Sequence, residues 1–335
     1  MESVTLVGID LGKHSFHLHG QDQLGRAVFR KKVSRKQLVE FFATFHACTV
    51  VMEACAGAHH MARKLAGLGH QVKLISPQFV RPFVKSNKND FVDAEARPSM
   101  RFVTPKTESQ QTLSALHRVR ESLIRDRTKT TNQMHGFLLE FGISLPVGQA
   151  VIARLPAVLA EHSLPARLIS ILERLHAHFK YLSEQIGEID REMVRQLADD
   201  DLGQRLLSIP GVGPVTASVL AAEMGDGKQY ACSQDFTASI GLVPRQYSTG
   251  GRANLLGISK RGDKNIRRLP VQCARAYMLR LERQSGHLAE WVRAMLARRH
   301  SNVVACALAN KLVRTAWTLA TRHTTFNAGA DPMSG

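Results

Sequence analysis

The chain has 335 residues, with 45 lysines and arginines against 28 aspartates and glutamates, a formal net charge of +17. This length predicts two or three domains, and a hydrophobic content of 44% excludes a disordered basic tail. The charge excess indicates a polyanionic partner. The five cysteines form no C-x-x-C pair, so we expect no zinc site, no disulfide framework and a reducing, cytoplasmic setting. No apolar stretch approaches the ~20 residues of a membrane span and no leader pattern opens the chain, so we expect no secretion and no membrane insertion.

The first third of the chain alternates strand and helix patterns. Strands at 4–10, 15–21 and 26–33, joined by short turns, predict an antiparallel meander. A helix at 35–45, a strand at 48–53, a helix at 59–68, a strand at 71–76 and a helix after Pro77 follow. This order predicts a mixed α/β sheet with the layout of a ribonuclease H or RuvC-like domain. We assign residues 1–146 to it, including a long helix over 108–141.

A heptad pattern dominates residues 147–200. Its apolar positions are spaced four and three residues apart, at Leu168, Leu172, Leu175, Phe179, Leu182, Ile186, Ile189 and Met193. This seam predicts a coiled coil that pairs with another chain or with an internal helix. The alternative is an amphipathic helix packed on its own domain.

Residues 201–325 predict a third, mainly helical domain, and 326–335 a disordered tail. Its first part, 206–225, has the pattern helix, glycine-rich hairpin, helix around Gly211 and Gly213. Such a helix-hairpin-helix-like element holds a DNA phosphate through backbone N–H groups at a helix N-terminus. A tight connection without DNA is the alternative.

Four carboxylates are candidate metal ligands. Asp10 ends the first strand, Glu53 ends the fourth, and Asp90 and Asp93 lie three residues apart on one helical face. Taken singly, each acid is more typical of a turn or a helix cap. Taken together they predict a site for two Mg²⁺ ions, which would neutralise the cluster and assist phosphoryl transfer. The GIDLGK segment is also found in sugar kinases, but glycine-rich segments that would hold an adenosine are not evident.

The segment from Arg245 to Arg268 contains seven basic residues and one acid, a density that favours binding of a phosphate backbone. Ser248 lies inside it, ahead of Thr249 and two glycines. A serine needs a base or a metal for activation, and no histidine lies in the segment, so the acidic cluster is the available activator. The residues expected to contact nucleic acid are Lys13, Lys88, Gly211, Gly213, Arg245, Thr249, Gly250, Gly251, Arg252, Lys260, Arg261, Lys264, Arg267 and Arg268.

Taken together, these motifs resemble one family, the DEDD transposases of the insertion sequence 110 and 1111 group, and most closely its 1111-like branch. The matching segments are GIDLGK, VVMEAC, KNDFVDAEA, RPSMRFV, LLSIPGVGPVTA, GLVPRQYSTGG, LGISKRGDKNIRR and ALANKLVRTAW, between about residues 4 and 317.

The resemblance implies a Mg²⁺-dependent reaction in which a serine attacks a DNA phosphate and forms a covalent phosphoserine link. Asp10, Glu53, Asp90 and Asp93 would bind two metal ions, and the carboxylates and serine of different subunits would meet in a tetramer, a dimer of dimers assembled through the coiled coil. It further implies donor and target DNA, a guide (bridge) RNA and action at the bacterial nucleoid.

The sequence departs from the family pattern in two places. Ala96 is followed at once by Arg97, where the 1111-like branch has several more residues, so the helix with Asp90 and Asp93 is expected to be shorter. Other branches place the serine where this chain has Thr249, which leaves two candidate nucleophiles; we favour Ser248, the less hindered hydroxyl. The alternatives to a recombinase are a RuvC-like nuclease that uses activated water and a non-catalytic nucleic-acid-binding protein.

Overall fold

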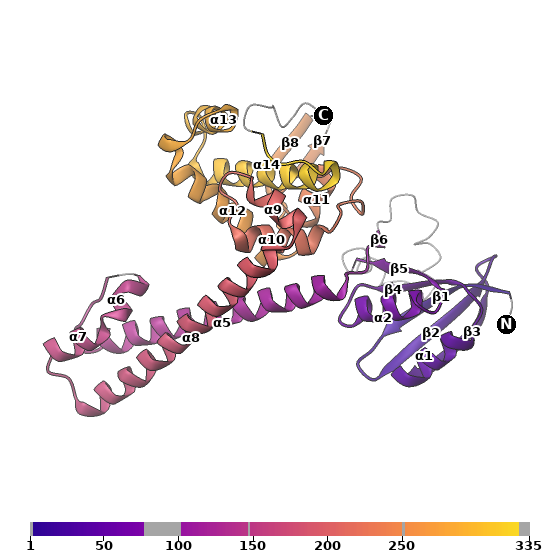
Figure 1. The fold of residues 1–335 in the computed structure, drawn as a ribbon, viewed down its shortest axis with the longest axis horizontal. Helices are drawn as coiled ribbons and strands as arrows, with labels where there is room; N and C mark the ends of the chain where they lie inside the picture. Colours follow the sequence, from indigo (N-terminus) through magenta and orange to yellow (C-terminus); the bar gives the residue numbers. More distant parts are fainter. Residues whose placement is uncertain (1–2, 77–101, 147, 250–251, 328–335) are drawn as a thin grey trace.

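The computed structural model describes residues 3–76, 102–146, 148–249 and 252–327. These form an N-terminal sheet with two helices, a long helical arm, and a mainly helical C-terminal part (Figure 1). The mixed α/β N-terminal region and the helical C-terminal region predicted from the sequence are confirmed. The helix expected after Pro77 lies outside the described residues.

The N-terminal sheet consists of six strands in the described chain: β1 Val4–Leu11, β2 Ser15–Asp22, β3 Ala27–Ser34, β4 Thr49–Glu53, β5 Gln71–Ile75 and β6 Phe102–Val103. Their order is β3-β2-β1-β4-β5-β6. The pairs β1–β2, β2–β3 and β5–β6 are antiparallel, whereas β4 runs parallel to β1 and to β5. The predicted meander and the predicted mixed sheet are therefore both confirmed.

Two helices, α1 Arg35–Thr44 and α2 Ala58–Ala66, bury one face of this sheet. Ser34 and Gln37 form a capping box that starts α1. The apolar core joins side chains of β1, β2 and β4 to those of the two helices, including Ile9, Leu18, Met52, Leu38 and Met61. Because successive side chains of a strand point to opposite faces, the residues immediately before and after Ile9 belong to the opposite face of the sheet.

The arm is an antiparallel pair of long helices, α5 Glu108–Leu139 and α8 Ala166–Ala198, with the short helices α6 Gln149–Ala153 and α7 Leu155–Glu161 at its tip (Figure 1). Met134 and Leu138 of α5 pack with Leu172 and Phe179 of α8. At the other end Arg120 donates to Asp190 at 2.5 Å. The heptad seam of α8 thus has an internal partner, and its pairing with another chain stays a prediction.

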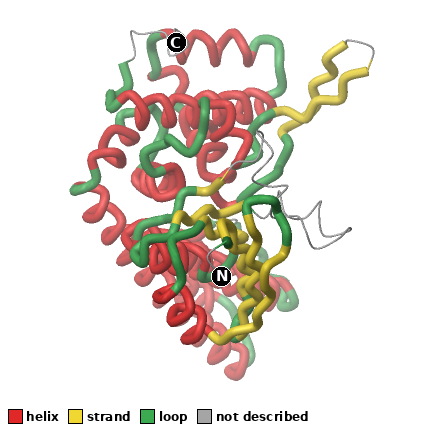
Figure 2. Tube along the Cα trace, turned by 90° about the vertical axis from the view of Figure 1, so that its right-hand side faces the viewer, coloured by secondary structure: helices red, strands yellow, loops and turns green. Residues whose placement is uncertain are grey.

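The C-terminal part contains the helices α9 Asp201–Leu207, α10 Pro214–Met224, α11 Ser233–Ser239, α12 Lys264–Leu279, α13 His287–Leu296 and α14 Ser301–Arg322, and the 3₁₀ turn η2 Leu281–Arg283. They share one apolar core. A hairpin of β7 Pro244–Thr249 and β8 Arg252–Ile258, which the sequence did not predict, projects from the helices (Figure 2). Phe326, at the start of the expected tail, donates its N–H to Ser208; residues 328–335 lie outside the described chain.

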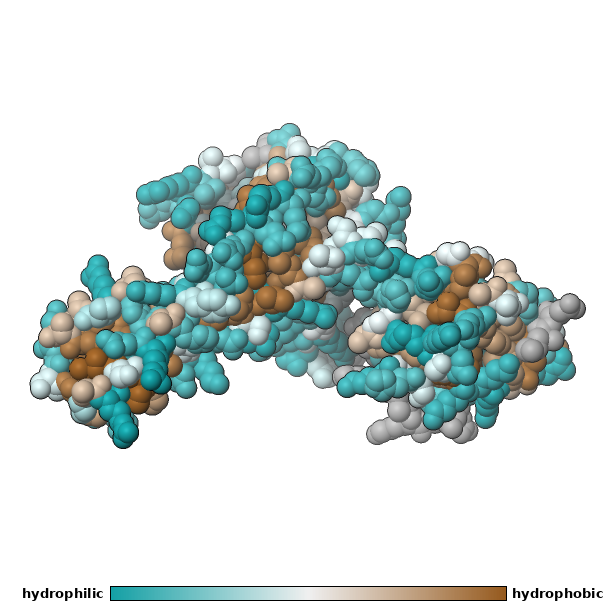
Figure 3. Space-filling model, turned by 60° about the horizontal axis from the view of Figure 1, so that its bottom comes forward, coloured by the Kyte–Doolittle hydropathy of each residue, from teal (hydrophilic) through white to brown (hydrophobic). Residues whose placement is uncertain are grey.

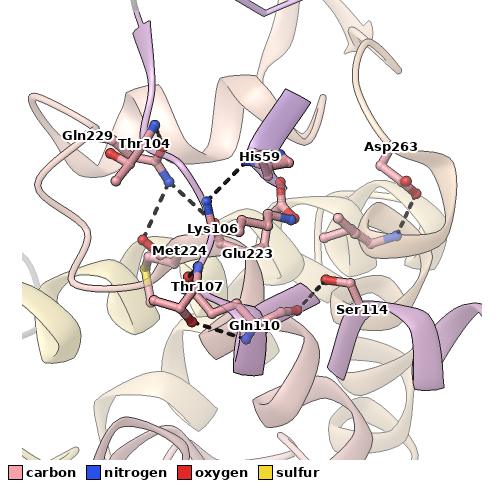
Figure 4. Close-up of polar contacts among 11 residues, drawn as sticks. His59, Thr104, Lys106, Thr107, Gln110, Ser114, Glu223, Met224, Gln229 and Asp263 are labelled. Carbon is pink, nitrogen blue, oxygen red and sulfur yellow. Dashed lines mark hydrogen bonds and ion pairs between the residues drawn. The ribbon is translucent and has the colours of Figure 1, made fainter. Parts of the chain in front are cut away.

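The sheet and the C-terminal helices meet at an interdomain joint formed by His59, Thr104, Lys106, Glu223 and Gln229 (Figure 4). The Lys106 ammonium donates to the Glu223 carboxylate at 2.6 Å, and the Lys106 N–H donates to Nδ1 of His59 at 3.0 Å. The Thr104 N–H donates to the Gln229 side chain at 3.1 Å. These bonds fix the segment between β6 and α5 against α10.

Among the described helices, none is long and apolar enough to cross a membrane.

Candidate active site

Asp10 and Glu53 occupy neighbouring positions at the carboxyl ends of two parallel strands. The register pairs Ile9 of β1 with Met52 of β4, and each carboxylate is the next residue along its strand. Ile9 and Met52 are buried under the helices, so Asp10 and Glu53 both belong to the other face of the sheet. The Asp10 side chain is 75% exposed, which leaves its oxygens open to a ligand.

Two further side chains surround this pair. The His17 imidazole lies across from Asp10 on β2, with its Nδ1 atom 3.7 Å from the carboxylate. Burial raises the pKa of the Cys55 thiol, and the Glu53 carboxylate and then Asp10 raise it further. The Cys55 N–H donates to the Glu53 carbonyl oxygen at 2.8 Å, so Cys55 lies at the same end of the sheet. The sequence pattern did not single out His17 or Cys55; the predicted pairing of the first two strands was the only available signal for His17.

The other two predicted ligands, Asp90 and Asp93, lie outside the described residues, as does Lys88 and the short spacer after Ala96. Within the described ranges, no cluster of three or more histidine, cysteine, aspartate or glutamate side chains forms a metal site. The donor chemistry of Asp10 and Glu53 nevertheless fits a hard cation, because carboxylate oxygens are the ligands that Mg²⁺ prefers and the exposed Asp10 lies beside the half-buried Glu53. Lys13 is exposed in the turn that follows β1.

Ser248 and Thr249 are the last two residues of β7, where their backbones pair with Ala253 and Arg252 of β8. Gly250 and Gly251, at the tip, lie outside the described residues. The base of the hairpin is anchored: the Ser259 N–H donates to Val243 O at 2.8 Å and the Lys260 N–H donates to Gly241 O at 3.1 Å. The hairpin stands apart from the N-terminal sheet in both views (Figures 1 and 2).

Two glycines, Gly241 and Gly262, close the base of the hairpin. Both have a positive φ, and a Cβ atom on Gly241 would collide with the backbone of Arg261, just as one on Gly262 would collide with that of Ser239. Only glycine permits this conformation and this close approach together. This role of the two glycines was not predicted from the sequence, although their positions on either side of the strands were a visible signal.

The basic side chains that the structure describes around the hairpin divide into two groups. Arg245, Lys260, Arg261 and Lys264 are exposed. Arg267 donates to the carbonyl oxygens of Ile240 and Arg261, at 3.1 and 3.0 Å, and Arg268 forms an ion pair with Glu121 of α5. Both arginines thus hold the protein together, and their contact with nucleic acid stays a prediction.

The predicted helix-hairpin-helix-like element corresponds to α9, the turn around Gly211 and α10. Gly211 is exposed with a φ of +82°, and a Cβ atom there would lie 3.1 Å from the Cys273 carbonyl oxygen and 3.2 Å from Tyr277 Cβ of α12. Gly213 is the N-cap of α10. Packing against α12 is a sufficient reason for glycine at 211, and a phosphate contact at this turn stays a prediction.

Two family models of known proteins match the chain. The family model described as transposase IS116/IS110/IS902 family matches residues 203–290, and a DEDD-type model described as transposase matches residues 7–143. Asp10 and Glu53 lie inside the match to the DEDD-type model, and the hairpin with Ser248 lies inside the match to the other model. These matches place the chain among insertion-sequence transposases.

Similarity to curated proteins extends over nearly the whole chain. The chain is 66% identical over 333 residues to the transposase for insertion sequence element IS1328 of Yersinia enterocolitica, covering 98% of this chain and all of that protein. It is 42% identical to a probable family 20 transposase of Pseudomonas aeruginosa, over 98% of this chain and all of that one, and 39% identical to the transposase for IS1111A of Coxiella burnetii, over 98% and 93%. The chain therefore belongs to the IS110/IS1111 family of insertion-sequence DEDD transposases.

Proposed function

We propose that the chain cuts and joins DNA strands through a covalent phosphoserine intermediate formed by Ser248. The observation that carries this proposal is the β1–β4 register, which sets Asp10, exposed, beside the half-buried Glu53 at the carboxyl ends of two central strands, on the face of the sheet that α1 and α2 do not cover. The described residues around this pair of carboxylates include no serine or threonine assigned to the attack, and the hairpin that carries Ser248 contains no histidine to act as a base.

The described carboxylates supply part of a ligand set that Asp90 and Asp93 would complete. Two Mg²⁺ ions, when bound, would stabilise the entering and leaving oxygens of the phosphoryl transfer. The serine oxygen then forms a bond to phosphorus while a DNA hydroxyl leaves, and the reverse attack by another DNA hydroxyl releases the serine and joins the strands. The exchanged strands would pass through a Holliday-junction-like intermediate.

Assembly follows from the separation of the two half-sites. Because the hairpin and the sheet stand apart in one chain, Ser248 of one subunit would reach the carboxylates of another (Figure 1). We propose a homotetramer, built as a dimer of dimers. The α8 seam is covered by α5 of its own chain, so the arm would contribute its outer face or its tip to this assembly.

Sequence recognition is assigned to base pairing by a guide RNA encoded by the element, while the protein binds backbone and shape. The charge of +17 and the exposed Arg245, Lys260, Arg261 and Lys264 beside the hairpin support such backbone contacts with donor and target DNA. Sequencing the RNA that co-purifies with the protein tests this point, and we expect one discrete non-coding species from the flank of the gene.

The test of the nucleophile is Ser248→Ala. We expect this variant to lose covalent protein–DNA adducts on denaturing gels, with a loss of at least about 1000-fold in strand exchange, while nucleic-acid binding stays near wild type. Thr249→Ala is the matched control and keeps the adduct. Persistence of adducts in Ser248→Ala together with their absence in Thr249→Ala would assign the attack to Thr249.

The same assay separates the remaining alternatives. Cleaved DNA with free ends and no attached protein would indicate a nuclease that uses activated water. Unchanged DNA reactions in both Asp10→Asn and Glu53→Gln would indicate a non-catalytic binding protein.

A further inference from the structure

A row of basic side chains continues the line of the two carboxylates across the N-terminal sheet. The β1–β2 register sets His17 opposite Asp10, and the β2–β3 register sets Lys32 opposite His17. One step along the strands, Gly8, His19 and Arg30 are opposite one another in the same way. Directly paired residues project from the same face of a sheet, so both rows share the face of Asp10 and Glu53.

The intervening residues confirm which face this is. Ile9 and Leu18 are buried under α1, and their partner Lys31 lies over the Phe41 ring of α1 at 4.9 Å. The helix-covered face of β3 therefore carries Lys31. Arg30 and Lys32, on either side of it, are exposed on the other face.

The charge at this edge is one-sided. The eleven residues from Arg26 to Lys36 include six basic residues and no acidic one. Four of the six contact a partner in the structure: Arg26 with Asp22, Lys31 with Phe41, Arg35 with Phe16, and Lys36 with Glu40. In the described part of the chain, Arg30 and Lys32 form no hydrogen bond, ion pair or ring contact.

Charged side chains protect an edge strand against pairing with a strand of another molecule, which explains why β3 is charged. This explanation applies equally to Lys31 and to every other lysine of the strand. It does not account for two unpaired cations on the face of the carboxylates, of which Lys32 is in register with Asp10. Adjacent strands are about 4.8 Å apart, so the Cα atoms of Lys32 and Asp10 are separated by about 10 Å, within reach of the flexible lysine side chain and a phosphate next to the one that reacts.

We propose that Arg30 and Lys32 hold the phosphate backbone of the DNA strand that leads into the Asp10–Glu53 site, with His17 between them and the carboxylates. The positive row offsets the repulsion between a DNA strand and the acidic pair. DNA is the occupant because the row that contains Lys32 ends at the Asp10 carboxylate, where the proposed reaction places the DNA phosphate. The choice of DNA as the partner rests on the proposed function, and the positions of the side chains rest on the strand register.

The experiment compares two variants of the full-length protein that lose the same charge. Arg30→Gln/Lys32→Gln removes two cations from the carboxylate face, and Lys31→Gln/Lys36→Gln removes two cations at the same edge away from that face. The affinity for a fluorescent single-stranded DNA of mixed sequence is measured between about 50 and 200 mM salt, together with thermal unfolding. The same titration is repeated with an RNA of identical sequence.

For a single strand, the loss of two phosphate contacts makes the slope of log affinity against log salt shallower by about 1.4. Between about 50 and 200 mM salt, the affinity of the variant therefore falls by a factor about sevenfold smaller than the factor by which the wild-type affinity falls. We expect this change in Arg30→Gln/Lys32→Gln with DNA and wild-type behaviour in the control pair. Equal slopes in the two variants, or a change seen with RNA alone, would overturn the proposal. Binding does not require cleavage, so this result is independent of the Ser248→Ala adduct assay.

Discussion

At the scale of single residues, His117 links the arm to the C-terminal helices. Its Nε2 atom is 3.0 Å from the hydroxyl of Ser218, a fully buried residue of α10. Burial lowers the pKa of His117 to about 4, and the nearby Arg120 contributes in the same direction. The imidazole is therefore neutral in the folded protein at neutral pH, and the unfolded chain is the form that takes up a proton first.

This difference predicts a loss of stability in acid. Below its ordinary pKa of about 6.5, His117 is protonated in the unfolded chain but stays neutral in the folded one until about pH 4, so the free energy of unfolding falls across this window by up to ~1.4 kcal/mol per pH unit. In His117→Gln, which retains a hydrogen-bonding side chain, we expect a shallower decline in denaturant titrations between these pH values.

The matched control for this prediction is His178→Gln, which alters an exposed histidine of α8 and is expected to follow the wild-type pH dependence. An unchanged decline in His117→Gln would show that other groups cause the acid sensitivity.

At the scale of elements, the hairpin depends on its base more than on its strands. Only two strands pair here, and an isolated two-stranded hairpin is marginally stable in water. Asn310 of α14 donates to Leu242 O at 3.2 Å, and Arg267 of α12 to Ile240 O, so α12 and α14 hold the segment that enters β7. Gly241 and Gly262 bring the entering and leaving segments into backbone contact.

Gly241→Ala is expected to destabilise this base. The left-handed backbone costs alanine about 1–2 kcal/mol, and the collision with Arg261 adds to it. Strand exchange should fall at least tenfold, and hydrogen exchange at the β7 amides should accelerate. Gly257→Ala in β8 is the control, because a Cβ atom there meets nothing within 4 Å and the φ is ordinary; equal effects of the two substitutions would contradict the role assigned to the base.

At the scale of the whole molecule, the interdomain joint sets the sheet relative to the helices (Figure 4). Burial lowers the pKa of His59, and the charge of Lys106 lowers it further, which favours a neutral imidazole whose Nδ1 accepts from the Lys106 N–H. The Lys106–Glu223 ion pair is largely shielded, with 18% and 31% of the two side chains exposed.

Hydrophilic residues cover much of the face of the molecule in Figure 3, while apolar residues also show at the tip of the arm. At the end of α5, Leu139 and Phe141 are exposed.

Lys106→Met is expected to loosen the joint, because it leaves the Glu223 carboxylate shielded without its cation at a cost of about 1–3 kcal/mol. Limited proteolysis should then cut the segment between β6 and α5 several times faster than in the wild type. Lys228→Met removes a solvent-exposed partner of Asp226 and should leave the cleavage rate unchanged. Equal cleavage rates in wild type and Lys106→Met would show that the ion pair does not hold the domains.

Much of the fold was predictable because its signals are local. Alternating residues in 4–33 specify the meander, and the absence of proline and near-absence of glycine in 108–141 specify the helix observed as Glu108–Leu139. The heptad spacing of α8 specified a buried seam but not its partner, because an apolar stripe is equally suited to a helix of the same chain and one of another chain. The strands β7 and β8 were missed because their partners are each other and few of their side chains enter a core.

The sequence by itself determined the family, the α/β-then-helical order and the candidate carboxylates and serine, since these depend on residue type and short spacing. Tertiary structure alone decided that α8 pairs with α5, that Arg267 and Arg268 are engaged within the protein, and that His17 and Lys32 lie in one row with Asp10. The physical reason is that register and helix pairing are set by contacts between segments far apart in the chain, where loop closure and packing, rather than local preference, select the partner.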